Sequence, residues 1–288
     1  MLEEASVRAP NVLLWFYSVR NRSEEDIMEL TIYAKKVVRA LIIAVLLITL
    51  VSFVARVAMY MWGVEGYLQP LRIFDVGEER SIPTWFESIL FLLCSILLAV
   101  VTVAKKRRND RYRLHWGVLS IILLLLSLDE VASIHEAIGQ QSERLLHSIT
   151  GLTPSGAISF FWVVPGTIFV VVVLLAYLRF LADLPRSTRR LFLFAGALFV
   201  LGALGLEMLT AQVMSSSGSI ANWVASSSGG MVGQESASAI PKILKGLQTC
   251  VEEMFEMLGL TAFVYALLAY IRSYIEDINV RVRIDKSA

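Results

Sequence analysis

Six long runs of apolar residues constrain the fold of this chain more than any other feature. A helix needs about 20 apolar residues to cross a hydrocarbon core of about 30 Å, and each run approaches or exceeds that length. With 56% hydrophobic and only 18% charged residues, the composition excludes an ordinary soluble domain. The sequence therefore predicts an all-α, six-transmembrane-helix bundle, with spans near residues 38–62, 84–104, 114–139, 158–182, 190–214 and 247–272.

Lysine and arginine are distributed unevenly between the two sides of these predicted spans. Most of the 26 basic residues lie before residue 40, in 105–113, in 179–190 and after residue 271. Because such flanks remain in the cytoplasm, we expect both termini to be cytoplasmic and the protein to lie in the cytoplasmic (inner) membrane of a bacterium. A formal net charge of +1 argues against a nucleic-acid partner, so membrane lipids are the expected partners.

The segments outside the spans give weaker signals. Residues 1–37 begin with acidic residues instead of a basic stretch and a short apolar core, so we expect an amphipathic, interfacial helix and no cleaved signal. Residues 273–288 are expected to form a cytoplasmic tail. Of the two long outer connections, 63–83 is expected to fold back over the bundle, and the Ser/Gly-rich 215–246 to be flexible or to form a lid.

Ionisable residues inside the predicted spans carry the clearest functional signal. Charges inside a membrane are costly, so they usually mark a cavity or a partnered pair. At a rise of about 1.5 Å per residue, Arg56, His135 and every acid inside the spans lie within about 15 Å of the outer surface, although the acids come from four helices that run in both directions. We therefore predict one acidic cavity that opens to the periplasmic or extracellular side.

Helical spacing suggests roles for these residues. Glu252, Glu253 and Glu256 share one sector of the last span, where three carboxylates must share protons or bind a cation. Asp129 and Glu136 fall on one stripe of the third span if that helix is continuous. We assign Asp129, Glu136, Glu207, Glu252, Glu253 and Glu256 as metal ligands, Glu130 and His135 as catalytic residues, and Glu87 and Arg56 as supporting residues.

One histidine among many carboxylates favours a hard or borderline divalent metal ion, namely Mg²⁺, Mn²⁺, Ca²⁺ or Fe²⁺. The sequence favours a metal-dependent enzyme, which would use this metal on a lipid-like or amphipathic substrate. As a transporter or channel, the same carboxylates would bind and release H⁺ or a metal cation. A third hypothesis is an accessory membrane protein in which a buried polar network only fixes helix packing.

Three segments also carry a resemblance. The sequence has Pro83-Thr84-Trp85-Phe86 at a helix entry, an SLDE-x4-HE segment over 127–136 and an EE-x2-EMLG segment over 252–259. In this order they resemble a group of uncharacterised bacterial multi-pass membrane proteins, over roughly residues 70–275. The resemblance brings no activity. It implies that the acidic residues and the histidine of the last two segments belong to one site: Asp129, Glu130, His135, Glu136, Glu252, Glu253 and Glu256.

Overall fold

A computed structural model describes residues 33–61, 69–78, 80–151, 163–209, 217–227 and 234–275. Every regular element in these ranges is helical, so the predicted all-α class is confirmed. Most of the expected interfacial segment (1–37) and nearly all of the expected tail (273–288) lie outside the described residues.

Six helices in the described ranges are long and apolar enough to cross a membrane, which confirms this part of the prediction. α2 begins two residues earlier than expected because the Ser81 side chain caps it, accepting a hydrogen bond from the Thr84 N–H, while Pro83 suits the first turn. The spanning helices are α1 (Ala34–Met61), α2 (Ile82–Arg107), α3 (Arg113–Ala132), α5 (Val163–Asp183), α6 (Arg186–Val200, continued by the π-helix η4, Leu201–Leu206) and α9 (Gln234–Tyr274).

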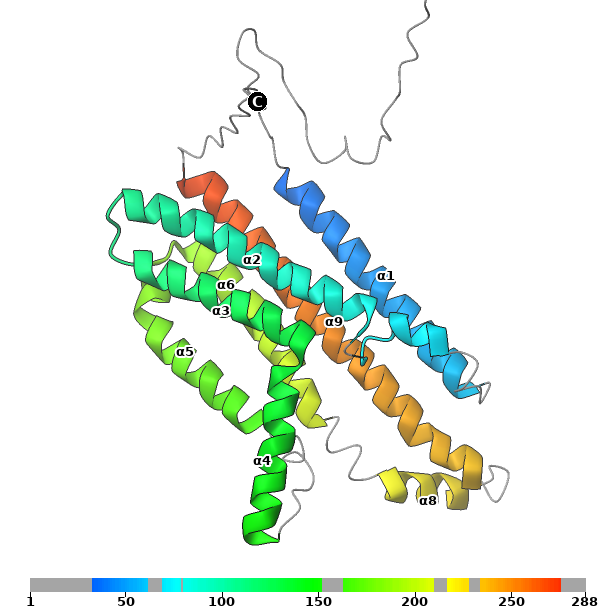
Figure 1. The fold of residues 1–288 in the computed structure, drawn as a ribbon. Helices are drawn as coiled ribbons and strands as arrows, with labels where there is room; N and C mark the ends of the chain where they lie inside the picture. Colours follow the sequence, from blue (N-terminus) through cyan, green and yellow to red (C-terminus); the bar gives the residue numbers. More distant parts are fainter. Residues whose placement is uncertain are drawn as a thin grey trace, which may run out of the picture.

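The third span is shorter than predicted, because the helix breaks at Ser133. This residue adopts a left-handed conformation with φ of 50°, and the chain continues as a separate helix, α4 (Ile134–Thr150), that projects away from the end of α3 (Figure 1). The expected span over 114–139 is therefore wrong beyond Ala132. The single stripe predicted for Asp129 and Glu136 is also wrong, since the two residues lie on different helices.

The outer connections contain more helix than their sequences predicted. The short 3₁₀ helix η2 (Gln69–Phe74) follows α1, and α8 (Ser217–Ser227) packs against α9, which itself starts 13 residues before the expected 247. Ser and Gly are weak helix formers, but packing against a neighbouring helix overrides that preference. The described parts of 215–246 are thus helical, and the expectation of a flexible segment or lid stays a prediction.

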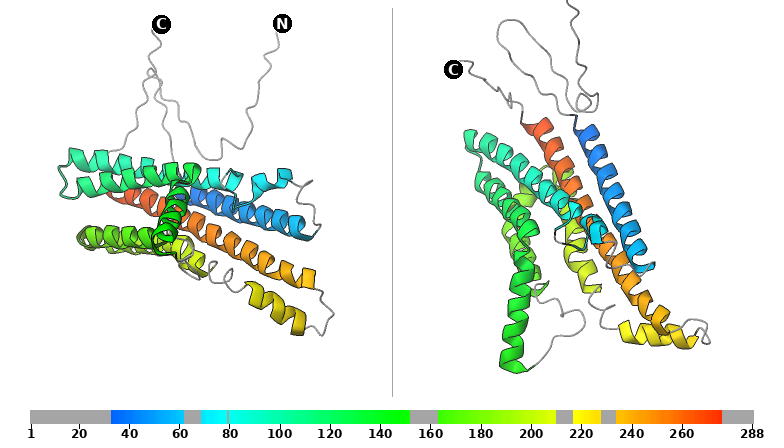
Figure 2. Two further views of the ribbon diagram at one scale, coloured as in Figure 1. Left: turned by 60° about the horizontal axis from the view of Figure 1, so that its bottom comes forward. Right: turned by 45° about the vertical axis from the view of Figure 1, so that its right-hand side comes forward.

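α9 is the central helix of the bundle. It packs against α1, α2, α6 and α8, and lies between the α2–α3 pair and the α5–α6 pair (Figure 2). α1 begins and α9 ends at the same end of the bundle (Figure 1). We call this the terminal end, and the opposite end, where α2 and α9 begin, the loop end.

Two reciprocal serine pairs fix the register of antiparallel α2 and α3. The Ser88 and Ser127 hydroxyls each donate to the other residue's carbonyl, at 2.8 and 2.9 Å. Seven residues along each helix, Ser95 and Ser120 repeat this arrangement, both at 2.8 Å. Small residues and interhelical hydrogen bonds hold membrane helices together where lipid offers no hydrophobic driving force.

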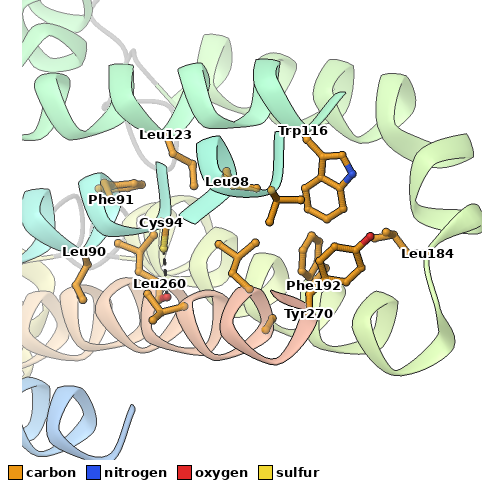
Figure 3. Packing of buried hydrophobic residues seen from close by; sticks show 14 of the residues in the cluster. Leu90, Phe91, Cys94, Leu98, Trp116, Leu123, Leu184, Phe192, Leu260 and Tyr270 are labelled. Carbon is orange, nitrogen blue, oxygen red and sulfur yellow. Dashed lines mark hydrogen bonds between the residues drawn. The ribbon is translucent and has the colours of Figure 1, made fainter. Parts of the chain in front are cut away.

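The terminal half of the bundle is filled by apolar and aromatic side chains. Cys94 of α2 lies 3.7 Å from the Leu260 carbonyl of α9, and around them Leu90, Leu98 and Leu123 close the interior (Figure 3). Nearer the terminal end, the Trp116 ring packs 4.9 Å from those of Phe180 and Tyr270. The ionisable residues of the interior thus lie toward the loop end of a closed apolar core.

Candidate ion-binding site

Four carboxyl groups from three helices lie within electrostatic range of one another inside the bundle. The Glu87 side chain of α2 hydrogen-bonds to that of Glu253 on α9, and lies within electrostatic range of Glu130 on α3 and Glu256 on α9. Glu253 and Glu256 also interact electrostatically with Glu130. We name Glu87, Glu130, Glu253 and Glu256 the acid cluster.

Glu87 occupies the most enclosed position in the acid cluster. It is only 1% exposed, and its Oε1 atom has no hydrogen-bond partner among the described residues. Two ionised carboxylates are acceptors only, so the hydrogen bond between Glu87 and Glu253 requires a proton between them, or a bound cation that replaces it. The unpartnered oxygen gives the cluster one further ligand atom.

Helix packing explains why these acids meet. Ser88 fixes α2 against Ser127 of α3, so Glu87 lies beside that contact and Glu130 lies one helical turn beyond it. α2 also packs on α9, which brings Glu87 to Glu253. The register of three helices therefore assembles the cluster.

The π-helix η4 forms another side of the site. A Cβ atom on Gly202 would lie 2.6 Å from Cγ of Glu256 and 2.9 Å from the Glu252 carbonyl, so the two helices touch there. The wider helical turn leaves carbonyls without their usual partners, and the Gln248 side chain donates to the Leu206 carbonyl at 3.0 Å. Glu207 directly follows η4 and acts electrostatically on Glu256.

Asp129 and His135 form a pair at the corner between α3 and α4. One Asp129 oxygen accepts from the His135 backbone N–H at 2.9 Å, and the other lies 2.8 Å from the His135 ring Nδ1. A carboxylate at the first turn of a helix satisfies its open N–H groups, so Asp129 stabilises the start of α4 and offsets the break at Ser133. Both side chains are partly exposed, at 24% and 35%.

Arg56 of α1 brings a positive charge beside α9. It forms an ion pair with the buried Asp75 that follows η2, and its Nη1 donates to the Gly246 carbonyl of α9 at 3.5 Å. Its guanidinium also acts electrostatically on Glu253. A side chain at Gly77 would collide with this guanidinium, which explains the glycine. The ion pair thus fastens the connection after α1 to α9.

The structure brings most of the predicted site residues into one region, with some differences. Glu253, Glu256, Glu130 and Glu87 form the acid cluster, and Glu252 and Glu207 flank it. Asp129 directs both oxygens to His135 instead of to the cluster. The side chain of Glu136 lies outside what the structure describes.

Several residues that shape the site were missed from the sequence. Asp75 gave no signal because it lies in a connection with other acids. Ser88, Ser95, Ser120 and Ser127 do carry a signal, since each helix repeats serine at a spacing of seven. Gly202 and Gln248 gave no such signal, because the formation of a π-helix depends on contacts with neighbouring helices and not on a local sequence pattern.

The described residues contain no group of three or more His, Cys, Asp or Glu side chains arranged to hold a metal ion. The divalent metal therefore stays a prediction.

Residues 40–271, most of the chain, match the family described as "Domain of unknown function (DUF8692)". The chain belongs to this family. The DUF8692 match includes every residue of the acid cluster, together with Arg56 and the Asp129–His135 pair. No curated protein and no solved structure matches the chain.

Proposed function

We propose that this protein is a proton- or cation-coupled membrane transporter whose ion-binding residues are Glu87, Glu130, Glu253 and Glu256. The observation that carries the proposal is the Glu87 carboxyl, which is only 1% exposed, interacts with the Glu253 carboxyl and has no basic partner among the described residues. Loss or exchange of the shared proton changes the charge inside the bundle. A change of charge between helices supplies the free energy that favours one arrangement of them over another.

A role in packing alone explains Glu87 less well. Buried polar groups that serve only stability are almost always hydrogen-bonded, because an unsatisfied one costs about 1–3 kcal/mol. Four acids around one point add mutual repulsion to that cost. An ion that visits the site accounts for both features.

Interrupted helices around the acid cluster also support transport. α6 widens into η4 beside Glu256, and the helical path of α3 breaks three residues after Glu130. Discontinuous helices at ion sites are common in transporters, since they expose backbone groups and allow helix segments to move separately. The apolar core of the terminal half closes the path on that side.

The orientation follows from the basic residues at the terminal end. We place both termini in the cytoplasm and the acid cluster nearer the outer side of a bacterial cytoplasmic membrane. Ions would then enter from the periplasmic or extracellular solution.

The test uses the full-length protein in liposomes with a trapped pH-sensitive dye. We expect an imposed pH gradient, or gradients of Mn²⁺ or Mg²⁺, to drive ion flux. The variants Glu87→Gln and Glu253→Gln should slow this flux by at least about tenfold. The infrared band of protonated carboxyl groups should weaken in both variants.

Glu143→Gln is the matched control, because Glu143 is an exposed acid on α4, the helix that projects away from the end of α3 (Figure 1). This variant should keep both flux and infrared band. Equal flux in wild type and all three variants, or flux no higher than in empty liposomes, would contradict transport.

The second candidate is a metal-dependent enzyme that acts on a lipid-like substrate, and the Asp129–His135 pair favours it. A histidine that ligates a metal or serves as a general base is usually oriented by a carboxylate on its other ring nitrogen, as Asp129 does here. The same preparations decide this. Stoichiometric Mg²⁺, Mn²⁺, Ca²⁺ or Fe²⁺ in the wild type, lost in Asp129→Asn and Glu253→Gln, with no flux, would establish the enzyme instead.

A further inference from the structure

A hollow of about 300 Å³ lies between α1 and α9 toward the terminal end, far from the acid cluster. Its walls are almost entirely apolar, and its two cationic residues contribute mainly the carbon stems of their side chains. The lining residues are Lys35, Val38, Arg39, Ile42, Ile43 and Tyr265.

The two cations lie at one end of this hollow. Lys35 and Arg39 are four residues apart, so their side chains extend from the same face of α1 within its first turns. Neither forms an ion pair with any described residue. They therefore present positive charge at the membrane boundary.

The rest of the hollow is apolar and runs into the membrane. Ile43 lies about 12 Å along α1 from Lys35, which is within the thickness of one leaflet. Ile42 and Ile43 are 39% and 48% exposed on the membrane-facing surface of α1. The groove is positively charged at the membrane boundary and apolar below it. This pattern complements an anionic phospholipid, which has a negative headgroup above apolar acyl chains.

We propose that this groove between α1 and α9 binds an anionic phospholipid. The phosphate contacts Lys35 and Arg39, and one acyl chain lies along Val38, Ile42 and Tyr265. Basic pockets between transmembrane helices bind anionic headgroups in this way, most strongly in the leaflet that carries anionic lipid.

The bound lipid would hold α1 to the bundle. Among the six spanning helices α1 has the smallest buried share. It also carries Arg56, whose ion pair with Asp75 fastens the outer connection. A lipid at the other end of α1 therefore stabilises the helix that positions Arg56.

The experiment measures lipid binding by native mass spectrometry and thermal unfolding of the full-length protein in detergent. Phosphatidylglycerol should bind and raise the unfolding temperature more than phosphatidylcholine does. In Lys35→Gln/Arg39→Gln, the affinity for phosphatidylglycerol should fall by at least about tenfold, since each cation near a headgroup contributes on the order of 1 kcal/mol. The matched control, Lys106→Gln/Arg107→Gln, removes two exposed cations at the terminal end of α2 and should keep the wild-type affinity.

A second pair of variants tests the apolar part without changing charge. Ile42→Trp fills the groove and should weaken phosphatidylglycerol binding, whereas Leu175→Trp, exposed on α5 and not part of the groove, should not. Equal binding of the two lipids by the wild type, or equal losses in variants and controls, would overturn the proposal. An equal rise in unfolding temperature with inorganic phosphate would also overturn it, by indicating an anion site without a lipid. None of these results depends on transport.

Discussion

At the scale of single residues, the close approach of α6 and α9 depends on two glycines. Gly202 faces Glu256, and a Cβ atom on Gly259 would lie 2.7 Å from the Phe199 backbone nitrogen and 2.9 Å from its Cα. Backbone atoms cannot move aside as a flexible side chain can. α9, which carries Glu252, Glu253 and Glu256, can therefore lie directly against α6 and η4, because neither glycine has a side chain in the way.

We expect Gly259→Ala to destabilise the protein by about 1–3 kcal/mol, because the added methyl forces the two helix backbones apart. Gly196→Ala on α6 is the control, since no atom lies within 4 Å of its Cβ position and alanine favours helix. Thermal unfolding in detergent measures both. A Gly259→Ala protein as stable as Gly196→Ala would disprove the close approach.

At the scale of elements, a charged turn joins α2 to α3. The Lys105 ammonium donates to Asp110 at 2.9 Å, and the Tyr112 N–H donates to its other oxygen at 2.8 Å. Burial of the Asp110 carboxyl raises its pKa, but these two hydrogen bonds and the charge of Lys105 outweigh burial and leave the pKa below its usual value. A carboxyl with a lowered pKa stabilises the folded state when it is ionised.

Ionised Asp110 should contribute fully to the free energy of unfolding at pH values above the unfolded-state pKa of about 3.9. This contribution should be lost as the pH falls through the lower pKa of the folded state. Asp110→Asn should therefore lower stability at pH 7 by about 0.5–1 kcal/mol. Its difference from wild type should shrink as the pH falls below about 4 and should vanish only below the lowered pKa of the folded state, where Asp110 is also uncharged. Unfolding temperatures across pH measure this effect. Asp183→Asn, which changes an exposed carboxylate, is the control, and a pH-independent difference for Asp110→Asn would rule out the explanation.

At the scale of the whole molecule, charge is separated between the two ends. Basic residues collect at the terminal end, and the acid cluster lies toward the loop end. This separation predicts the orientation of the protein in the membrane.

Single introduced cysteines test the orientation. A membrane-impermeant maleimide should label Ser148→Cys on exposed α4 in intact cells, and should label Lys106→Cys at the terminal end only after permeabilisation. The native thiols give little background, because Cys94 and Cys250 are 0% and 2% exposed. The reverse labelling pattern would place the acid cluster toward the cytoplasm.

The sequence alone determined the helical class, the six spans and the gathering of acids at one depth. Each of these depends on composition and helical rise, which are local properties of a chain in a membrane. The third span shows the limit: its apolar spacing continues past Ser133, so nothing in the periodicity reveals the break that Asp129 stabilises by capping α4.

Only the tertiary structure decided which acids meet. Glu87 joins Glu253 because serine pairs set α2 on α3 and α9 lies at the centre, whereas Asp129 turns to His135 at the corner. Helix register, the π-helix at η4 and the length of α9 all arise from contacts between residues far apart in sequence. The free energies of those contacts belong to pairs of helices, so no single segment encodes them.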